Sequence, residues 1–439
     1  MTTIQSEPKS VIAPVAIPSL RANFAWTLAG NVVYGGCQWG MLSSLAKLGS
    51  PSVVGQFTLG LAISAPVFMF TNLQLRVVQA TDVNAESDFG NYFTLRLLAT
   101  VLGLAVILAM LPFVGTSNSV RLVILLVSLS KCLECMSDVA AGLLQREEQL
   151  KRVAISLMIR GTISVVVFSS AFVFTRDLKF SIMGMCVVWG SVLLFYDLPN
   201  VRRFGRFHES FFRLDRRELF RLSMLGMPLG WVATFATLTV NIPRYFLQHY
   251  LGLADLGIYA SLAYMVVAIS LVVGALSVSV TTRLARLFAN GQYRQFVGLL
   301  RKLSMLGVLI AVVGVPLAFL VGRPLLTLLY RREYADHVGL LALFVGTAGV
   351  GTVGTFVFCG LNAARAFRSQ VPVQLAGLSV AVAGSALLVP RLGLIGAGTA
   401  LFLSTLSIVL GGLWTIYRVL ASNSRGLGRT NETRMPSSV

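Results

Sequence analysis

The chain has 439 residues, of which 56% are hydrophobic and only 12% are charged. Soluble globular domains carry roughly 25% charged residues and could not bury so large an apolar fraction. These values exclude an ordinary soluble fold and indicate a protein that crosses a membrane several times.

Apolar stretches of about 20 residues, long enough to cross about 30 Å of hydrocarbon, recur along the whole chain. They lie at residues 21–45, 53–73, 92–114, 119–144, 152–174, 179–197, 222–248, 256–281, 300–322, 338–361, 371–389 and 394–418. We therefore predict an all-α polytopic membrane protein with about 12 transmembrane helices. Because the number of spans is even, both termini lie on the same side of the membrane.

The net charge of +19 is unevenly distributed over the predicted loops. About 25 of the 36 Lys and Arg residues fall on the side that carries the N-terminus, and about eight fall on the other side. This bias is typical of cytoplasmic loops, so we predict that both termini are cytoplasmic. The charge then reflects membrane insertion and contact with anionic lipid, and we expect no nucleic-acid partner.

A basic and aromatic segment divides the chain into two similar halves. Residues 199–221 contain seven arginines and several phenylalanines, a composition typical of a segment at the membrane surface. We predict a cytoplasmic N-terminal tail (1–20), an N-terminal six-helix lobe (21–198), this linker (199–221), a C-terminal six-helix lobe (222–420) and a disordered cytoplasmic tail (421–439). The first 18 residues do not resemble a cleaved signal peptide.

A short internal repeat supports the two lobes. Leu48-Gly49 precedes VGQF at 54–57, and Leu251-Gly252 precedes LGIY at 256–259, an offset of 203 residues that becomes 202 after a one-residue gap. A repeat with an even number of helices is parallel, so we predict a pseudo-twofold axis along the membrane normal and a central cavity between the lobes.

The first helix of each lobe carries a polar stripe at helical spacing. The stripes consist of Asn23, Thr27, Asn31, Tyr34 and Gln38, and of Thr234, Thr237, Asn241, Arg244 and Gln248. At the offset of 203, Asn31 corresponds to Thr234, Tyr34 to Thr237 and Gln38 to Asn241. The stripes either form hydrogen bonds within a static bundle or face one aqueous cavity, and the sequence leaves both interpretations open.

Four ionisable residues are predicted to lie within the membrane. Lys131, Glu134 and Asp138 share one helical face, and Arg160 of the next helix lies at a depth between the two carboxylates, counting about 1.5 Å per residue. Because an unpaired charge in hydrocarbon is costly, we predict that the four form a neutral ion cluster. A proton relay at the same residues is the alternative.

Arg244 differs from these residues because no acidic residue lies within one turn of it on its own helix. We interpret it as an uncompensated cation on the polar stripe, next to the helix-distorting Pro243. For catalysis the sequence offers no Walker loop, metal-ligand pair or nucleophile elbow, and the five cysteines form no disulfide pattern. We expect no enzyme activity, metal or cofactor, while coupling to an ion gradient or to the membrane potential stays open.

Three segments resemble the oligosaccharide and polysaccharide flippases of bacterial envelopes, a family of the same superfamily as the multidrug and toxin extrusion antiporters. They are the polar residues from Lys131 to Gly161, NIPRYFLQHYLGLADLGIYA at 241–260, and RLGLIGAGTALFLS at 391–404. The resemblance implies an inner-membrane protein that flips an undecaprenyl-pyrophosphate-linked oligosaccharide for O-antigen or exopolysaccharide assembly, alongside other polysaccharide-assembly proteins. In that role Arg244, Arg76 and Arg283 would bind the pyrophosphate, and the two polar stripes would form hydrogen bonds with the sugar.

Three other functions compete with this interpretation. A cation-coupled multidrug exporter of the same superfamily should place an acidic residue in a cavity-lining helix, and the first helix has none. A polysaccharide polymerase or ligase normally needs a large outer loop, and the predicted outer loops are short. A scaffold of the same assembly machinery stays open, and a leaflet-resolved translocation assay would separate it from a flippase.

Overall fold

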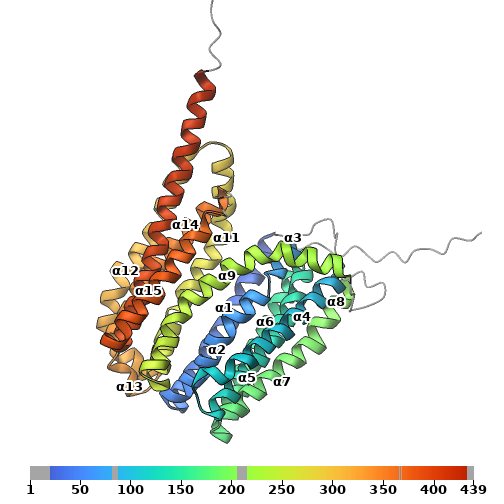
Figure 1. Cartoon of the computed structure of the whole chain (residues 1–439), viewed down its shortest axis with the longest axis vertical. Helices are drawn as coiled ribbons and strands as arrows, with labels where there is room; N and C mark the ends of the chain where they lie inside the picture. Colours follow the sequence, from blue (N-terminus) through green and yellow to red (C-terminus); the bar gives the residue numbers. More distant parts are fainter. Residues whose placement is uncertain (1–19, 82–87, 205–214, 365, 367, 433–439) are drawn as a thin grey trace, which may run out of the picture.

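The structure is a computed structural model that describes residues 20–81, 88–204, 215–364, 366 and 368–432. Over these residues the regular structure is entirely helical (Figure 1). The elements are α1 (Leu20–Leu48), α2 (Pro51–Thr71), α3 (Leu75–Thr81), α4 (Phe89–Met110), η1 (Leu111–Val114), α5 (Asn118–Arg146), α6 (Leu150–Thr175), α7 (Leu178–Val192), η2 (Leu193–Asp197), α8 (Leu198–Phe204), α9 (Arg216–Tyr250), α10 (Leu253–Met265), α11 (Val267–Ala289), α12 (Tyr293–Leu329), α13 (Arg332–Ala335), α14 (Val338–Ala363) and α15 (Gln370–Glu432).

The predicted membrane spans correspond to these helices. Eight of the described helices are long and apolar enough to cross a membrane, and the pair α10 and α11, bent by 40°, makes a ninth span. The helices α1 and α5 are each 29 residues long, which is enough to cross a membrane. They are not among the eight because the polar stripe lowers the hydropathy of α1 and because α5 carries the charged residues. Because α15 consists of two helices joined at a kink, the described residues provide a helix for each of the twelve spans expected from the sequence.

Local sequence explains where several helices begin and turn. Pro51 occupies the first turn of α2, where its missing N–H removes no helical hydrogen bond. Asp215 caps α9 by accepting hydrogen bonds from the backbone N–H groups of Arg217 and Glu218. Gly393 interrupts α15 with a φ of 56°, a left-handed conformation that glycine adopts without strain. The second half of α15 then packs back on the first.

The two lobes meet through a reciprocal contact that relates them as equivalent halves. A Cβ atom on Gly55 of α2 would lie 1.8 Å from the carbonyl oxygen of Leu253, and one on Gly257 of α10 would lie 1.9 Å from that of Pro51. Both glycines, and both carbonyl residues, are 202 positions apart in the sequence. A contact in which each half offers the same residue to the other is characteristic of twofold symmetry. The VGQF and LGIY repeat therefore lies close to the pseudo-twofold axis.

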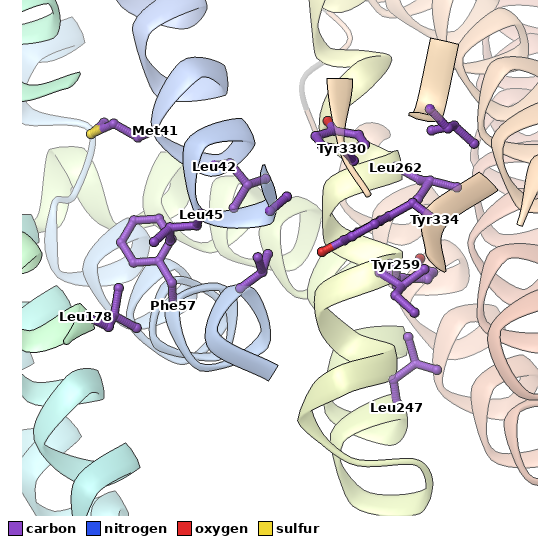
Figure 2. Packing of buried hydrophobic residues seen from close by; sticks show 14 of the residues in the cluster. Met41, Leu42, Leu45, Phe57, Leu178, Leu247, Tyr259, Leu262, Tyr330 and Tyr334 are labelled. Atoms are coloured by element: carbon purple, nitrogen blue, oxygen red, sulfur yellow. The ribbon is translucent and has the colours of Figure 1, made fainter. Parts of the chain in front are cut away.

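The N-terminal lobe comprises α1–α8 and the C-terminal lobe comprises α9–α15. The lobes lie close together at the end that carries α13, and toward the end that carries α3 and α8 they diverge except at the first half of α9, which packs on α2, α3 and α4 (Figure 1). We call the first the α13 end. A hydrophobic core cluster extends across both lobes there, with Met41, Leu45 and Phe57 on one side and Tyr259 and Tyr334 on the other (Figure 2).

Some predicted boundaries differ from the structure. The helix α15 continues to Glu432, past the boundary predicted at residue 420. The linker predicted at 199–221 begins as α8 and ends within the first turns of α9. Residues 1–19, 205–214 and 433–439, which include most of the N-terminal tail, the centre of the linker and the last part of the C-terminal tail, lie outside the described residues.

Candidate functional site

A polar cavity of about 200 Å³ lies inside the N-terminal lobe, and we call it the N-lobe cavity. Five elements line it, namely α1, α3, α5, α6 and η2. Its lining includes five ionisable groups besides the Tyr34 hydroxyl. The lining residues are Asn31, Tyr34, Arg76, Glu134, Ser137, Asp138, Ala141, Leu144, Val153, Ser156, Leu157, Arg160 and Asp197. The structure thus brings together three of the predicted substrate residues, Asn31, Tyr34 and Arg76, with three members of the predicted ion cluster.

Glu134 links two helices of the lobe. One of its carboxylate oxygens accepts a hydrogen bond of 2.6 Å from Lys131 Nζ, an ion pair at i and i+3 on α5. The other oxygen accepts a hydrogen bond of 3.2 Å from the Tyr34 hydroxyl of α1. The predicted placement of Lys131 and Glu134 on one helical face is therefore confirmed, and Tyr34 ties the polar stripe of α1 to the charged face of α5.

Asp138 has different partners from the predicted one. Its two carboxylate oxygens accept hydrogen bonds of 3.2 Å from Arg76 Nη1 and of 3.0 Å from Arg96 Nη2. Arg96 is fully buried and also donates to the backbone carbonyl of Asn72 at 3.0 Å. Among the described residues Arg160 forms no direct ion pair with Asp138 or Glu134, although it lines the same cavity as both, and Arg76 of α3 and Arg96 of α4 are the partners of Asp138. The tertiary packing of α4 on α5 is what buries Arg96.

Arg160 instead lies between two aromatic rings. Its guanidinium carbon is 5.4 Å from the centre of the Tyr34 ring and 5.5 Å from that of Trp189, distances typical of cation–π contacts. Trp189 is held by a hydrogen bond of 2.8 Å from its indole N–H to Ser164 Oγ. Arg160 is only 6% exposed, and its Nε and Nη1 atoms have no hydrogen-bond partner among the described residues. Arg160 therefore offers free donors at the wall of the N-lobe cavity.

Asp197 is a site residue that the sequence analysis missed. It is the last residue of η2, a single π-helical turn that interrupts the predicted sixth span. Its Oδ1 accepts a hydrogen bond of 2.7 Å from Ser156 Oγ, while its buried Oδ2 has no partner among the described residues. A π-turn rotates the side chains that follow it around the helix axis, so that they point to another side of the helix. Such turns often occur at functional sites. An aspartate inside an apolar span is the signal that could have identified it.

The polar stripe of α9 lies in the C-terminal lobe, apart from the N-lobe cavity. Thr234, Thr237 and Asn241 donate hydrogen bonds of 2.7 to 2.8 Å to backbone carbonyls one turn earlier in α9. Arg244 Nη1 donates to Asn241 Oδ1 at 3.0 Å, and the buried Nε of Arg244 has no partner among the described residues. The donors of the three uncharged residues are thus satisfied within their own helix.

The remaining predicted substrate residues do not join these groups. Gln38 is half-buried on α1, and Arg283 is exposed on α11. In the N-terminal stripe, Thr27 and Asn31 also donate to backbone carbonyls one turn earlier, each at 2.8 Å. Apart from the Tyr34 hydroxyl, which donates to Glu134 of α5, the described hydrogen bonds of the two stripes lie within their own helices, and both predicted interpretations of the stripes stay open.

Comparison with known proteins identifies the family. Residues 20–288 match the family model described as "Polysaccharide biosynthesis protein", which covers more than half of the chain. The chain belongs to this family. The capsular polysaccharide biosynthesis protein CapF of Staphylococcus aureus is 26% identical over 386 residues, which cover 87% of this chain and 95% of the relative. The family confirms the expected link to polysaccharide biosynthesis.

Solved structures of two transporters share the fold. The lipid II flippase MurJ in an inward closed conformation matches with a TM-score of 0.70 and 12% identity, covering 94% of each chain. A point mutant of the Vibrio cholerae MATE transporter VcmN matches with a TM-score of 0.62 and 14% identity, covering 93% of this chain and 96% of that one. The chain is therefore a multi-pass membrane protein with the fold of these two proteins.

Proposed function

We propose that this protein flips an undecaprenyl-pyrophosphate-linked oligosaccharide repeat unit across the bacterial cytoplasmic membrane, for O-antigen or exopolysaccharide assembly. It acts as a transporter and not as an enzyme, with both termini in the cytoplasm. Family membership, the two-lobe fold and the charge bias of the loops support this function. The lobes rock about their shared contact to expose the substrate site to each side in turn, while the prenyl chain stays in lipid.

The observation that carries the proposal is the buried guanidinium of Arg160. A buried cation needs hydrogen-bond partners as well as nearby anions, and although the carboxylates of Glu134 and Asp197 line the same cavity, Nε and Nη1 of Arg160 have no hydrogen-bond partner among the described residues. Its unpartnered Nε and Nη1 atoms are charged donors that suit the oxygens of a phosphate. The rings of Tyr34 and Trp189 fix the plane of the guanidinium in advance. A pyrophosphate in the N-lobe cavity would supply the missing partner.

The rest of the cavity suits a sugar. Carboxylates accept hydrogen bonds from sugar hydroxyl groups, and Asp197 Oδ2 is an unused acceptor in the lining. Asn31 is exposed to the cavity and can both donate and accept. Gln38 extends the same stripe along α1 toward the α13 end, where an oligosaccharide longer than the cavity would reach it. The cavity thus offers donors for phosphate and acceptors for hydroxyl groups side by side.

In this proposal one arginine of each lobe binds the phosphate, Arg160 in the N-terminal lobe and Arg244 in the C-terminal lobe. Arg244 keeps the substrate role expected from the sequence, and its buried Nε has no partner among the described residues. Thr234, Thr237 and Asn241 align with it on α9 and would meet the sugar. Arg76 is already paired with Asp138, so it would neutralise the cavity wall and not bind phosphate directly. Arg283 is exposed on α11 and would contact the pyrophosphate headgroup earlier, as the substrate enters from the cytoplasm.

The test is a leaflet-resolved translocation assay in proteoliposomes with an undecaprenyl-pyrophosphate oligosaccharide. Arg160→Ala and Arg244→Ala should each lower translocation roughly 10-fold to 100-fold, the size expected for losing a hydrogen bond to a charged group. Arg160→Lys should recover only part of the rate, since it keeps the charge but loses the planar donor pair. Arg121→Ala serves as the control, because Arg121 is remote from the cavity lining and donates hydrogen bonds to nearby Asn118 and Pro112.

The protein must stay folded in both variants for the assay to be informative. Glu134 and Asp138 keep their partners when Arg160 is removed, so membrane levels of Arg160→Ala should approach those of the parent. A parental translocation rate from well-inserted Arg160→Ala protein would rule out this residue as a phosphate ligand. Absence of any translocation by the parent protein would instead contradict the flippase function.

A cation-coupled multidrug exporter is the second candidate, and Asp197 is the observation that favours it. A buried carboxylate with a free oxygen can bind a proton or a metal cation. Expression of such an exporter should raise the resistance of a sensitive bacterial strain to cationic drugs, and Asp197→Asn should abolish that resistance. Unchanged drug sensitivity, together with translocation of the lipid-linked sugar, would favour the flippase.

A further inference from the structure

Two basic residues connect the lobes at the α13 end. Lys47, in the last turn of α1, extends its Nζ to the C-terminus of α12 in the other lobe. There it donates hydrogen bonds to the carbonyl oxygens of Leu328 at 2.9 Å and Tyr330 at 3.1 Å, with Thr327 at 3.4 Å. The last carbonyls of a helix have no partner within it and carry a partial negative charge, so a cation there is favourable.

Arg331 makes the converse contact. It follows the end of α12, and its guanidinium donates to the carbonyl oxygen of Lys47 at 3.2 Å and to that of Leu48 at 3.4 Å. These carbonyls form the C-terminus of α1. Each lobe therefore supplies a cation that caps a helix of the other lobe. We call the Lys47 and Arg331 hydrogen bonds together the exchanged caps.

Close backbone packing reinforces the exchanged caps. The crossing of α2 and α10 at Gly55 and Gly257 lies near the same end, because both helices begin there. The side chains that form the caps are still accessible, since Lys47 is exposed and Arg331 is only half-buried. Exposed charged contacts are individually weak and can break without a large energetic penalty. An arrangement of several weak contacts around one tight crossing suits a joint that must open and close.

We propose that the exchanged caps are the gate that holds the α13 end closed, and that both must break before the cavity can open there. The inference rests on the proposed alternating-access function, in which that end faces the outside of the cell. When the gate opens, Lys47 and Arg331 lose their carbonyl partners together and the C-termini of α1 and α12 separate. The caps thus shift the balance between the two states of the transporter toward the one described here.

The test measures access to the cavity from outside. Asn31→Cys, in a chain whose five native cysteines are replaced, places a single thiol in the lining of the N-lobe cavity. A membrane-impermeant maleimide is applied to intact spheroplasts, and to inverted vesicles in a parallel sample. Lys47→Gln and Arg331→Gln should each raise labelling from outside by up to about fivefold, and the double variant should raise it further. Lys47→Arg, which keeps a cationic donor, should stay close to the parent.

Matched controls come from the same end of the molecule. Lys179 forms an ion pair of 3.2 Å with Asp177 within the N-terminal lobe, and Arg121 bonds to Asn118 and Pro112 in that lobe. Lys179→Gln and Arg121→Gln should therefore leave labelling unchanged. Labelling from inverted vesicles should fall in the gate variants as labelling from outside rises, whereas a misfolded protein would be labelled more strongly from both sides.

Each failure has its own meaning. If the gate variants label like the controls, the exchanged caps are not a gate, whatever the outcome of the translocation assay. If labelling changes as expected but the parent translocates no lipid-linked oligosaccharide, the gate stands and the proposed substrate is wrong.

Discussion

At the scale of single residues, Arg96 is the basic residue whose loss should harm the protein most. Its side chain is 0% exposed and it holds one oxygen of Asp138. Arg96→Ala removes a fully buried guanidinium and leaves the half-buried carboxylate of Asp138 with Arg76 as its remaining partner, so it should lower the free energy of unfolding by about 3 kcal/mol. The melting temperature of the purified protein in detergent measures this loss.

Arg76→Ala provides the comparison for Arg96→Ala, because Arg76 contacts the same carboxylate with a side chain that is 35% exposed. Water can replace Arg76 as a partner of Asp138, so Arg76→Ala should lower the melting temperature clearly less than Arg96→Ala does. The double variant Arg96→Ala with Asp138→Ala should regain part of the stability, since no unpaired charge stays buried. Equal melting temperatures for both single variants would contradict the importance assigned to burial.

These residues also mark how far the sequence could predict the site. The Lys131 and Glu134 pair was predictable because both residues lie on one helix, where spacing alone fixes their distance. The partners of Asp138 were not, because Arg76 and Arg96 come from separate elements whose packing leaves no periodic signal. Asp197 was missed for a further reason, since the π-turn before it changes which side of the helix it faces.

At the scale of elements, the crossing of α2 and α10 yields a symmetric prediction. Gly55→Ala and Gly257→Ala should each force the two helices apart, because the added methyl group would meet a carbonyl oxygen at 1.8 or 1.9 Å. We expect both variants to lower the melting temperature by similar amounts, and to raise cysteine labelling from the α13 end. Gly36→Ala is the matched control on α1, where an added Cβ has no neighbour within 4 Å.

Alanine favours helices over glycine by about 1 kcal/mol, so Gly36→Ala should be neutral or stabilising. A Gly55→Ala protein as stable as the parent, with unchanged labelling, would show that the helices tolerate separation at this point. A large effect at only one of the two glycines would contradict the symmetric contact.

Element boundaries followed closely from the sequence, and the exceptions have physical causes. The thickness of the bilayer sets the length of an apolar run, so helices such as α6 and α14 begin and end within about two residues of the predicted spans. The break between α10 and α11 carries no such signal, because both sides of Val266 are equally apolar. The two-lobe division was predictable from the repeat, and the structure supplies its cause in the reciprocal glycines.

At the scale of the whole molecule, the charge bias predicts the orientation. Asp336→Cys, at the α13 end, should react with an impermeant thiol reagent applied to spheroplasts, since Asp336 is exposed. Gln292→Cys, exposed in the turn between α11 and α12 at the other end, should react only in inverted vesicles. Both measurements use the chain without its native cysteines. The same orientation requires tags at Ser6 and Ser437 to be cytoplasmic, and the reverse labelling pattern would contradict it.

The contact at the α13 end also determines how strongly a small rotation is amplified. The helix α12 has 37 residues and is therefore about 55 Å long, and because its C-terminus carries the contact with Lys47, its first residue lies far from the α13 end. A rigid-body rotation of about 15°, like those known between subunits, would then move the far end of such a helix by about 14 Å. With the lobes joined at the α13 end, a rearrangement of about an ångström among a few carbonyl contacts there would become a much larger displacement at the opposite face of the molecule.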